Sequence, residues 1–567
     1  MRPRHAVFVT VALSALVALS ALAADRPEGP MFATRSVVHA RHGMVAAAHP
    51  LAVQIGLDVL RQGGSAVDAA IAVNAALGVL EPVACGIGGD LFAIVWDAKT
   101  QRLYGLNASG RAPAAIAPDK VPAEPDGTIP LYSPYAWTVP GAVDGWFTLH
   151  ERFGRLPMST VLAPAIRAAR EGEPVPQVIA GAWERGARVF REKPGFAEVF
   201  LPAGRAPREG ELFRNPALAK AYEALAAGGR DAFYAGPIAA SIVAFSKKNG
   251  GFFELSDFAA HHSEWVEPIA TTYHGVTVHE LPPNGQGLAA LQMLNILESF
   301  DLRAMGRGSA AFWHTMVEAK KLAFEDRARY YADPAFAKVP VEGLLAKEYA
   351  RERAKLIDPA RAARRYDAGA PKGSDTTYLA VGDADGNMVS LIQSNYPGFG
   401  SGYCVAEWGF GLHSRGAQFS LKPGSPNRLA GGKRPFHTII PAFATRDGKP
   451  WLAFGVMGGD MQPQGHAQVI VNLVDFGMNL QEAGDAARFY HQGSSEPTGT
   501  AMTDGGTLAL ESGVPAEVRR DLLKLGHRLQ DATPAAFGGY QAVARDPATG
   551  VYAGASESRK DGCAMGY

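Results

Sequence analysis

A hairpin pattern about two-thirds of the way along the chain constrains the fold most. An apolar run at 379–381 leads into the turn-forming residues 383–387, and Met388–Ser394 has the composition of a return strand. Thr376 opens this pattern, as β-branched residues often do at the start of a strand. If the chain were cut just before it, however, Thr376 would carry an α-amine with a pKa of roughly 7.7–8.0, which can act as the base for its own hydroxyl. The pattern therefore predicts two strands and leaves Thr376 either structural or nucleophilic.

The composition is typical of a large globular protein. The chain has 567 residues, of which 47% are hydrophobic and 19% are charged, and its 55 basic and 55 acidic residues give a net charge of zero. This length is enough for a large core and for two or three domains. The balanced charge gives no indication of a nucleic-acid partner or an anionic membrane surface. We therefore expect a small-molecule partner.

The first residues have the pattern of a signal peptide. Arg2 and Arg4 precede a mostly apolar run at 6–19, and the small residues at 21–23 suit a signal peptidase. The run is shorter than the ~20 residues that span a bilayer, and no other segment has the pattern of a membrane-spanning helix. We predict that residues 1–23 are removed and that the mature protein is periplasmic or secreted, with no membrane attachment.

The cysteines and histidines give no indication of a disulfide framework or a metal site. The three cysteines, Cys85, Cys404 and Cys563, are too few for a disulfide framework. They leave room for one bridge, but buried free thiols are the simpler expectation. None of the 15 histidines has a zinc-site spacing. We predict neither a metal nor a cofactor.

Periodicity predicts a mixture of helices and strands. The segment 46–80 has helical apolar spacing, 140–360 is mostly helical in pattern, and a helix is expected over 516–525 after Pro515. Strand patterns occur at 92–96, 103–105, 379–394 and 451–456. The small, breaker-rich stretch 368–374 would suit backbone cleavage. Helices combined with antiparallel hairpins indicate an α+β protein with helices layered around sheets.

Short motifs along the chain occur in an order that is specific when taken together. They lie at 63–70, 80–82, 86–90, 111–113, 139–141, 322–327, 431–436, 457–460 and 559–562. In this order they resemble the γ-glutamyltranspeptidase family of N-terminal-nucleophile hydrolases, from about Ala46 to the C-terminus. The resemblance implies a four-layer αββα sandwich built jointly by a large subunit, 24–375, and a small catalytic subunit, 376–567, cut from one precursor.

By resemblance, Thr376 is the nucleophile. Its hydroxyl would first attack the carbonyl carbon of Asp375, so that the chain is cut between these two residues. The same hydroxyl would then attack a substrate amide, and water or an acceptor amine would release the acyl group from the enzyme. Thr377 is adjacent and stays an alternative, although the motif places the nucleophile first.

Further positions are assigned by the same resemblance. Gly458 and Gly459 match the glycine pair whose N–H groups bind the tetrahedral oxyanion, and glycine allows the close backbone approach that this requires. Ser394 stands where relatives have a threonine that hydrogen-bonds the nucleophile. Arg111 matches the arginine that holds the substrate α-carboxylate, for which a planar guanidinium is well suited.

The predicted substrate pocket departs from that of the γ-glutamyl enzymes. Two serines that bind the α-carboxylate are replaced by His437 and Thr438. The aspartate and glutamine that bind the α-amino group are replaced by Gln418 and Arg415, and an asparagine is replaced by Tyr396. Arg415 would repel a substrate ammonium. The segment 419–433 is also shorter than the form that carries a lid loop, so the chain resembles the lidless branch with its cephalosporin-acylase-like and oxamate-amidohydrolase-like members.

Three functions remain open from the sequence. The first is a γ-glutamyltransferase or glutathione hydrolase, which would pass the γ-glutamyl group of its substrate to water, an amino acid or a peptide. The second is an amidohydrolase or acylase for acyl groups that carry a carboxylate but no α-amine, such as glutaryl or oxamate-like groups. The third is a non-catalytic scaffold on the same fold, which the combination of Thr376, Arg111 and the glycine pair argues against.

Overall fold

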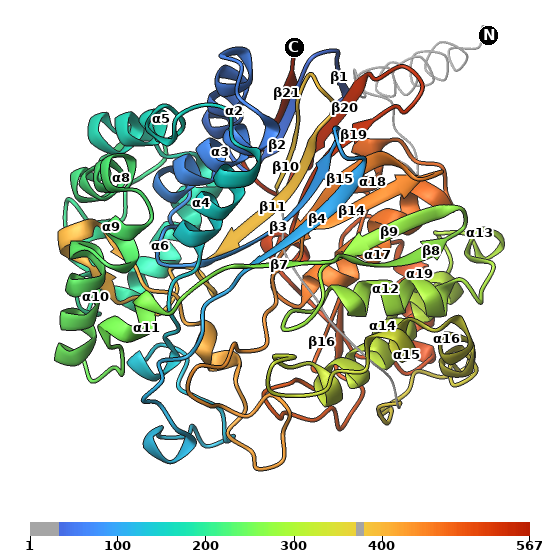
Figure 1. Cartoon of the computed structure of the whole chain (residues 1–567). Coiled ribbons are helices and arrows are strands. Elements are labelled where there is room, and N and C mark those ends of the chain that lie inside the picture. The colour runs from blue at the N-terminus through green and yellow to red at the C-terminus, as the bar shows by residue number, and fades with distance from the viewer. Residues whose placement is uncertain (1–32, 370–378) are drawn as a thin grey trace, which may run out of the picture.

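Two antiparallel sheets of seven strands each form the centre of the computed structural model, which describes residues 33–369 and 379–567 (Figure 1). The first sheet has the order β21 (Cys563–Gly566), β2 (Met44–Ala47), β10 (Ala380–Gly382), β11 (Met388–Ser394), β3 (Asp90–Asp97), β4 (Arg102–Ala108) and β7 (Glu264–Val266). The second has the order β1 (Val38–Ala40), β20 (Tyr552–Ser556), β19 (Gly539–Arg545), β15 (Lys449–Met457), β14 (Ala442–Arg446), β9 (Val276–Glu280) and β8 (Ile269–Tyr273).

The hairpin of β10 and β11 lies inside the first sheet, between β2 and β3. Val381 of β10 lies opposite Val45 of β2 on one side and opposite Val389 of β11 on the other. β11 then pairs along its whole length with β3, so that Ser394 lies opposite Asp90. The hairpin that follows residue 378 is therefore held on both sides by strands of the earlier part of the chain.

The two sheets pack face to face. One core cluster combines Phe92 and Ile94 of the first sheet with Phe443 and Val543 of the second. Successive side chains of a strand point to opposite faces, and Leu91, like the alternate residues after it, belongs to a second cluster on the other face of the first sheet. Because both faces of β3 are covered, its sequence is apolar almost throughout.

Helices cover the outer faces of both sheets (Figure 1). Those packed on the first sheet include α2 (Pro50–Arg61), α3 (Ala66–Leu80), α4 (Ala142–Phe153), α5 (Met158–Glu171) and α8 (Pro216–Gly228). Those packed on the second include α12 (Gly287–Leu297), α14 (Ala310–Tyr330), α17 (Met461–Val474), α18 (Leu480–Asp485) and α19 (Ala516–Lys524). Every residue of α3 is buried, which agrees with its small and apolar composition.

Most of the predicted elements are confirmed. The hairpin at 379–394 forms β10 and β11, the other strand patterns lie within β3, β4 and β15, and α19 begins directly after Pro515. The pattern of the segment 140–360 predicts mostly helices, and it misses the two-residue strands β5 (Glu173–Pro174) and β6 (Leu212–Phe213) as well as β7, β8 and β9. In β9, Val276, Val278 and Glu280 are buried while the two residues between them are partly exposed, so a short alternating pattern was present in the sequence.

All three cysteines lie in the described part of the chain and are free. Cys85 and Cys404 are buried as expected, whereas Cys563 is partly exposed. No helix within residues 33–369 and 379–567 is long and apolar enough to cross a membrane. The predicted signal peptide, 1–23, lies outside the described residues.

Two glycines of the 86–90 motif allow the start of β3 to lie against neighbouring backbone. A Cβ atom on Gly89 would lie 2.4 Å from the carbonyl oxygen of Ser394, and one on Gly88 would lie 2.0 Å from the carbonyl oxygen of Gly411. Neither distance is compatible with a real side chain, so the close approach requires glycine.

Gly89→Ala should therefore destabilise the fold. The backbone would have to move away from Ser394, and overpacking of this kind costs about 2 kcal/mol or more when the clash is with main-chain atoms. We expect a lower urea midpoint for Gly89→Ala. The matched control is Gly308→Ala, because a Cβ atom there meets nothing within 4 Å, and it should change the stability by less than about 0.5 kcal/mol. Equal midpoints for the two variants would show that the close approach relaxes without cost.

Candidate active site

A cavity of about 610 Å³ adjoins the C-terminal ends of β11 and β15. Ser394, at the end of β11, and Gly458 and Gly459, just after β15, line it. Leu379, the first described residue after the gap, lines it as well. The predicted nucleophile and cleavage site, Thr376 and Asp375, lie outside the described residues.

The glycine pair forms a tight turn that leads into α17. Gly458 has a φ of +130° and Gly459 a φ of +59°, values that favour glycine. Their carbonyl oxygens accept hydrogen bonds of 3.1 Å from the N–H groups of Met461 and Gln462, respectively. Within residues 33–369 and 379–567, neither glycine N–H donates to an acceptor. Two adjacent donors next to a cavity are what an oxyanion site requires.

Five of the predicted site residues form one connected cluster around Arg415. Nη1 of this fully buried arginine donates to Oγ1 of Thr438 over 2.7 Å, and Nη2 donates to Oγ of Ser394 over 3.4 Å. Its guanidinium lies over the ring of Tyr396, 4.2 Å from the centroid. Gln418 donates from Nε2 to the Tyr396 hydroxyl over 2.6 Å. Ser394, Tyr396 and Thr438 line the cavity, while Arg415 and Gln418 lie behind them.

The structure does not bring Arg111 and His437 to the cavity wall. The guanidinium of Arg111 binds the carboxylate of Glu264, which also accepts from Nη1 of Arg434 over 2.9 Å. The imidazole of His437 is fully buried, with Nε2 3.0 Å from Oδ2 of Asp90. In this structure His437 thus supports the segment that carries Thr438, and Arg111 is occupied by a carboxylate of the protein itself.

Asp90 joins several of the motifs, and sequence reasoning did not assign it a role. Its carboxylate accepts hydrogen bonds from the N–H groups of Gly110, over 2.9 Å, and Gly141, over 3.3 Å, in addition to its contact with His437. Burial alone would raise the pKa of Asp90, but His413, His437 and Arg415 hold it well below the usual range. An aspartate at the end of the glycine-rich motif 86–90 was the available signal.

The rest of the cavity wall is mainly apolar, with a few charged groups. Glu81 is buried at the end of α3, and burial raises its pKa to about 7. Lys560 and Asp561 line the cavity as well, and Asp561 accepts from the N–H groups of Val178 and Ile179. The cavity can therefore take an apolar group together with a charged one.

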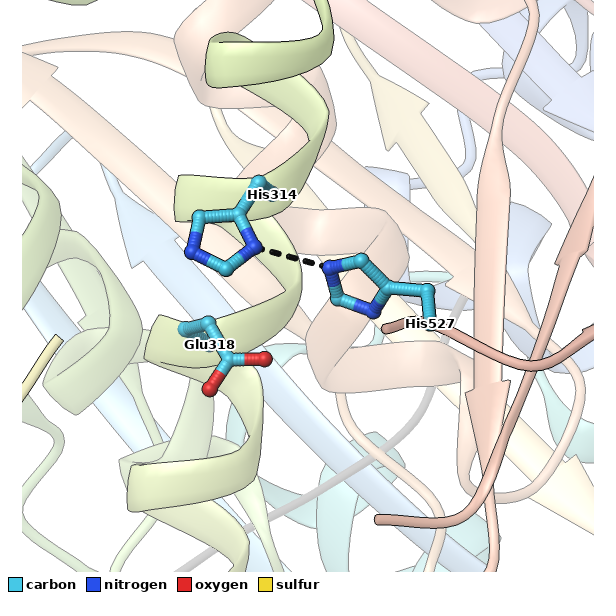
Figure 2. Close-up of side chains that lie close together, drawn as sticks. All are labelled: His314, Glu318 and His527. Carbon is cyan, nitrogen blue, oxygen red and sulfur yellow. Dashed lines mark hydrogen bonds between the residues drawn. The ribbon is translucent and has the colours of Figure 1, made fainter. Parts of the chain in front are cut away.

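Figure 2 shows a separate buried cluster of His314, Glu318 and His527, whose ligand atoms lie within 4.8 Å of one another. Nδ1 of His314 is 2.8 Å from Nε2 of His527, and Glu318 accepts from the ammonium of Lys321 over 2.7 Å and from the Tyr366 hydroxyl over 2.7 Å. The ammonium would oppose a divalent ion at this carboxylate. Hydrogen bonding accounts for the cluster without a metal.

Comparison with known proteins places the chain in a family. The family model described as Gamma-glutamyltranspeptidase matches residues 52–567. The glutathione hydrolase-like YwrD proenzyme of Bacillus subtilis is 40% identical over 445 residues, which cover 78% of this chain and 83% of that protein. The acylase ACY 1 proenzyme of Pseudomonas sp. (strain SE83) is 36% identical over 533 residues and 92% of each chain.

A solved structure is similar over nearly the whole length. The cephalosporin acylase from Bacillus halodurans has a TM-score of 0.88 and 43% sequence identity, with 96% of this chain and 98% of that chain covered. Other relatives are named as glutathione hydrolases or as an oxamate amidohydrolase. The chain therefore belongs to the γ-glutamyltranspeptidase family of enzymes, in which its relatives include both glutathione hydrolases and acylases or amidohydrolases.

Proposed function

We propose that this protein is a self-cleaving amide hydrolase that forms an acyl-enzyme on Thr376 and passes the acyl group to water or to an amine. The observation that supports it is the Gly458–Gly459 turn, whose N–H groups have no acceptor in the described chain and which lines the same cavity as Ser394. These donors would bind the oxyanion of the tetrahedral intermediate, and Ser394 would hydrogen-bond the nucleophile.

Chain connectivity agrees with a nucleophile at this place. Leu379 lines the cavity, and three residue steps separate it from Thr376. Each step spans at most ~3.6 Å, so the Cα atoms of these residues lie within about 11 Å of each other. We therefore expect an N-terminal threonine at this position to lie next to the cavity that the glycine turn also lines.

The proposed sequence of reactions uses one hydroxyl twice. Thr376 Oγ attacks the carbonyl carbon of Asp375, the peptide C–N bond breaks, and the hydroxyl proton passes to the nitrogen, which becomes the free α-amine of Thr376. Water then hydrolyses the resulting ester, which frees the carboxylate of Asp375 and restores the Thr376 hydroxyl. This amine then takes the hydroxyl proton as Oγ attacks a substrate amide, and the departing amine receives a proton. The large subunit, 24–375, and the small subunit, 376–567, would stay together in a joint αββα sandwich because both contribute strands to both sheets.

For the substrate, we favour an acyl group that carries a carboxylate but no α-ammonium. Arg415 lies directly behind Ser394 and Thr438, where its positive charge would oppose an ammonium group. Arg111, which the resemblance assigns to the acyl carboxylate, would have to release Glu264 and move to the cavity in order to bind it, and both side chains of that ion pair are partly exposed. The names of the acylase relatives agree with this substrate class, whereas those of the glutathione hydrolases favour a γ-glutamyl group as the second candidate.

Export is part of the same proposal. The N-terminal pattern at 1–23 supports removal of a signal peptide and a periplasmic or secreted enzyme. The proposed partners are the acyl-amide substrate and an acceptor amino acid or peptide, with no nucleic acid and no membrane.

Thr376→Ala should leave one uncut chain without amidase activity, because both steps use the same hydroxyl. Denaturing gel electrophoresis and mass spectrometry would show whether the chain is cut between Asp375 and Thr376. Thr377→Ala is the control and should be processed as in the wild type. Normal processing of Thr376→Ala together with an uncut Thr377→Ala would move the nucleophile to Thr377.

A pair of substrates separates the two candidate acyl groups. The wild type should have a higher kcat/KM for glutaryl-p-nitroanilide than for γ-glutamyl-p-nitroanilide. A charge-assisted hydrogen bond to the ammonium is worth roughly 1.5–3 kcal/mol, so its absence corresponds to a factor of about 10 to 100. A clear preference for the γ-glutamyl compound would instead identify a glutathione hydrolase.

The combined change Arg415→Gln and Gln418→Asp should shift this ratio toward the γ-glutamyl substrate, by about 10-fold or more, because it removes the cation and adds an acceptor. Arg307→Gln is a matched loss of a mostly buried arginine, whose guanidinium bonds to Asn472 and the carbonyl of Ala487. It should leave the ratio unchanged. If the double variant also leaves the ratio unchanged, these two side chains do not act on the acyl group.

A further inference from the structure

Arg327 lies at the centre of a buried polar network on α14, in the motif 322–327 that the proposed chemistry leaves without a role. The side chain is fully buried. Nη1 donates to Oδ1 of Asp460 over 2.6 Å and also to Oε1 of Gln286, and Nη2 donates to Oε2 of Glu496 over 2.5 Å. The ring of Phe324 lies against the guanidinium, 3.8 Å from its carbon to the ring centroid. The guanidinium is thus held in one orientation.

Gln286 connects this guanidinium to two segments of the cavity wall. Its Nε2 donates to the carbonyl oxygen of Thr438 over 2.8 Å and to that of Gly459 over 3.0 Å. A guanidinium has only donors, so the oxygen of the Gln286 amide must face Arg327 and its NH₂ group must face the two carbonyls. Arg327 therefore fixes the orientation of the Gln286 side-chain amide and, with it, the direction of the hydrogen bonds that Gln286 forms.

The turn that receives these bonds needs external restraint. Two consecutive glycines have more conformational freedom than any other pair of residues, and an oxyanion site depends on N–H groups that are already oriented before the reaction. The network holds the turn at two neighbouring points: Gln286 binds the carbonyl of Gly459, and Arg327 binds the side chain of Asp460, the next residue. The same glutamine holds Thr438, which also lines the cavity.

We propose that Arg327 is a positioning residue of the oxyanion site, which acts through Gln286 and Asp460 to hold the Gly458–Gly459 turn and the Thr438 segment in a fixed relative position. This role rests on the proposed function. Arg327 does not line the cavity within residues 33–369 and 379–567, so in this proposal its effect on the reaction passes through Gln286 and Asp460. Its loss should impair the step in which negative charge develops on the substrate oxygen while leaving ground-state binding nearly unchanged.

Two near-isosteric substitutions test the two steps of this hydrogen-bond network, from Arg327 to Gln286 and from Gln286 to the carbonyls of Thr438 and Gly459. Gln286→Glu keeps the acceptor for Arg327 but places a carboxylate oxygen against the carbonyls of Thr438 and Gly459. Arg327→Lys keeps the charge but loses the planar fork that reaches Gln286 and Glu496 together. Removal of one oxyanion donor typically lowers kcat by 10²–10³-fold. A misoriented turn should lower kcat somewhat less than the loss of a donor. We therefore expect kcat to fall about 10- to 100-fold, with KM changed by less than about threefold.

The control is Arg307→Lys, the same substitution at a partly buried arginine, because its contacts, Asn472 and Ala487, do not line the cavity. It should lower the melting temperature without lowering kcat. Rates are measured on cleaved enzyme and divided by the number of active sites, obtained from the burst of p-nitroaniline. The effects of Gln286→Glu and Arg327→Lys should also be non-additive when combined, since both act on one chain of bonds.

The outcomes separate this proposal from the proposed function. A wild type that is not cut at Thr376 and shows no burst would refute the function itself. With an active wild type, a loss of kcat in the two variants that is no larger than in Arg307→Lys would overturn the positioning role. If the variants accumulate only as uncut chains, a crystal structure of uncut Gln286→Glu decides the question. A displaced Gly458–Gly459 turn supports the proposal, and an unchanged turn refutes it.

Discussion

The pairing of β10 with β2 and β11 is the constraint on which the rest of the structure depends. β10 is short, but its backbone is bonded on both sides, with Ala380 opposite Ala46 and Ser390. A slip of one residue would turn Ala380 toward the helices and Val381 toward the second sheet, reversing two cores at once. The position at which the chain enters the cavity is therefore fixed by its neighbours in the sheet. It does not depend on the segment before Leu379, and for this reason a cut at Asp375 is compatible with an intact fold.

A second level of order comes from buried charges that are matched by directed partners. Burying a charge is costly unless it is paired or hydrogen-bonded. Asp90 satisfies this condition by accepting from two backbone N–H groups of distant loops and by contacting His437. Arg415 bonds to the hydroxyls of Ser394 and Thr438. Each of these groups joins segments that are far apart in the sequence, so the wall of the cavity is assembled by polar contacts on a scaffold that the apolar core has already positioned.

The local elements could be predicted from the sequence, but the long-range partners could not. The period-two pattern at 379–394 and the turn residues between its halves predict the β10–β11 hairpin, and resemblance brings Ser394, Tyr396 and Thr438 to one place. The charged stretch 318–327 of α14 has the composition of an exposed helix face, yet it is buried. Arg111 and His437 bind Glu264 and Asp90, which are 153 and 347 residues away. No local pattern specifies such partners, because they depend on which loops the completed sheets bring together.

The buried polar side chains of α14 can be explained by the restraint that the glycine turn needs. Glycine gives a backbone N–H group access to a ligand but supplies no rigidity of its own. Neighbouring elements must then hold the turn in place. Only polar side chains can hydrogen-bond to its backbone carbonyls and to the carboxylate of Asp460. An apolar side chain at position 327 of α14 would form no hydrogen bond to Gln286 or Asp460. In our proposal, the hydrogen bonds of the buried Arg327 and Gln286 give the cavity a defined geometry, which a site for a developing negative charge requires.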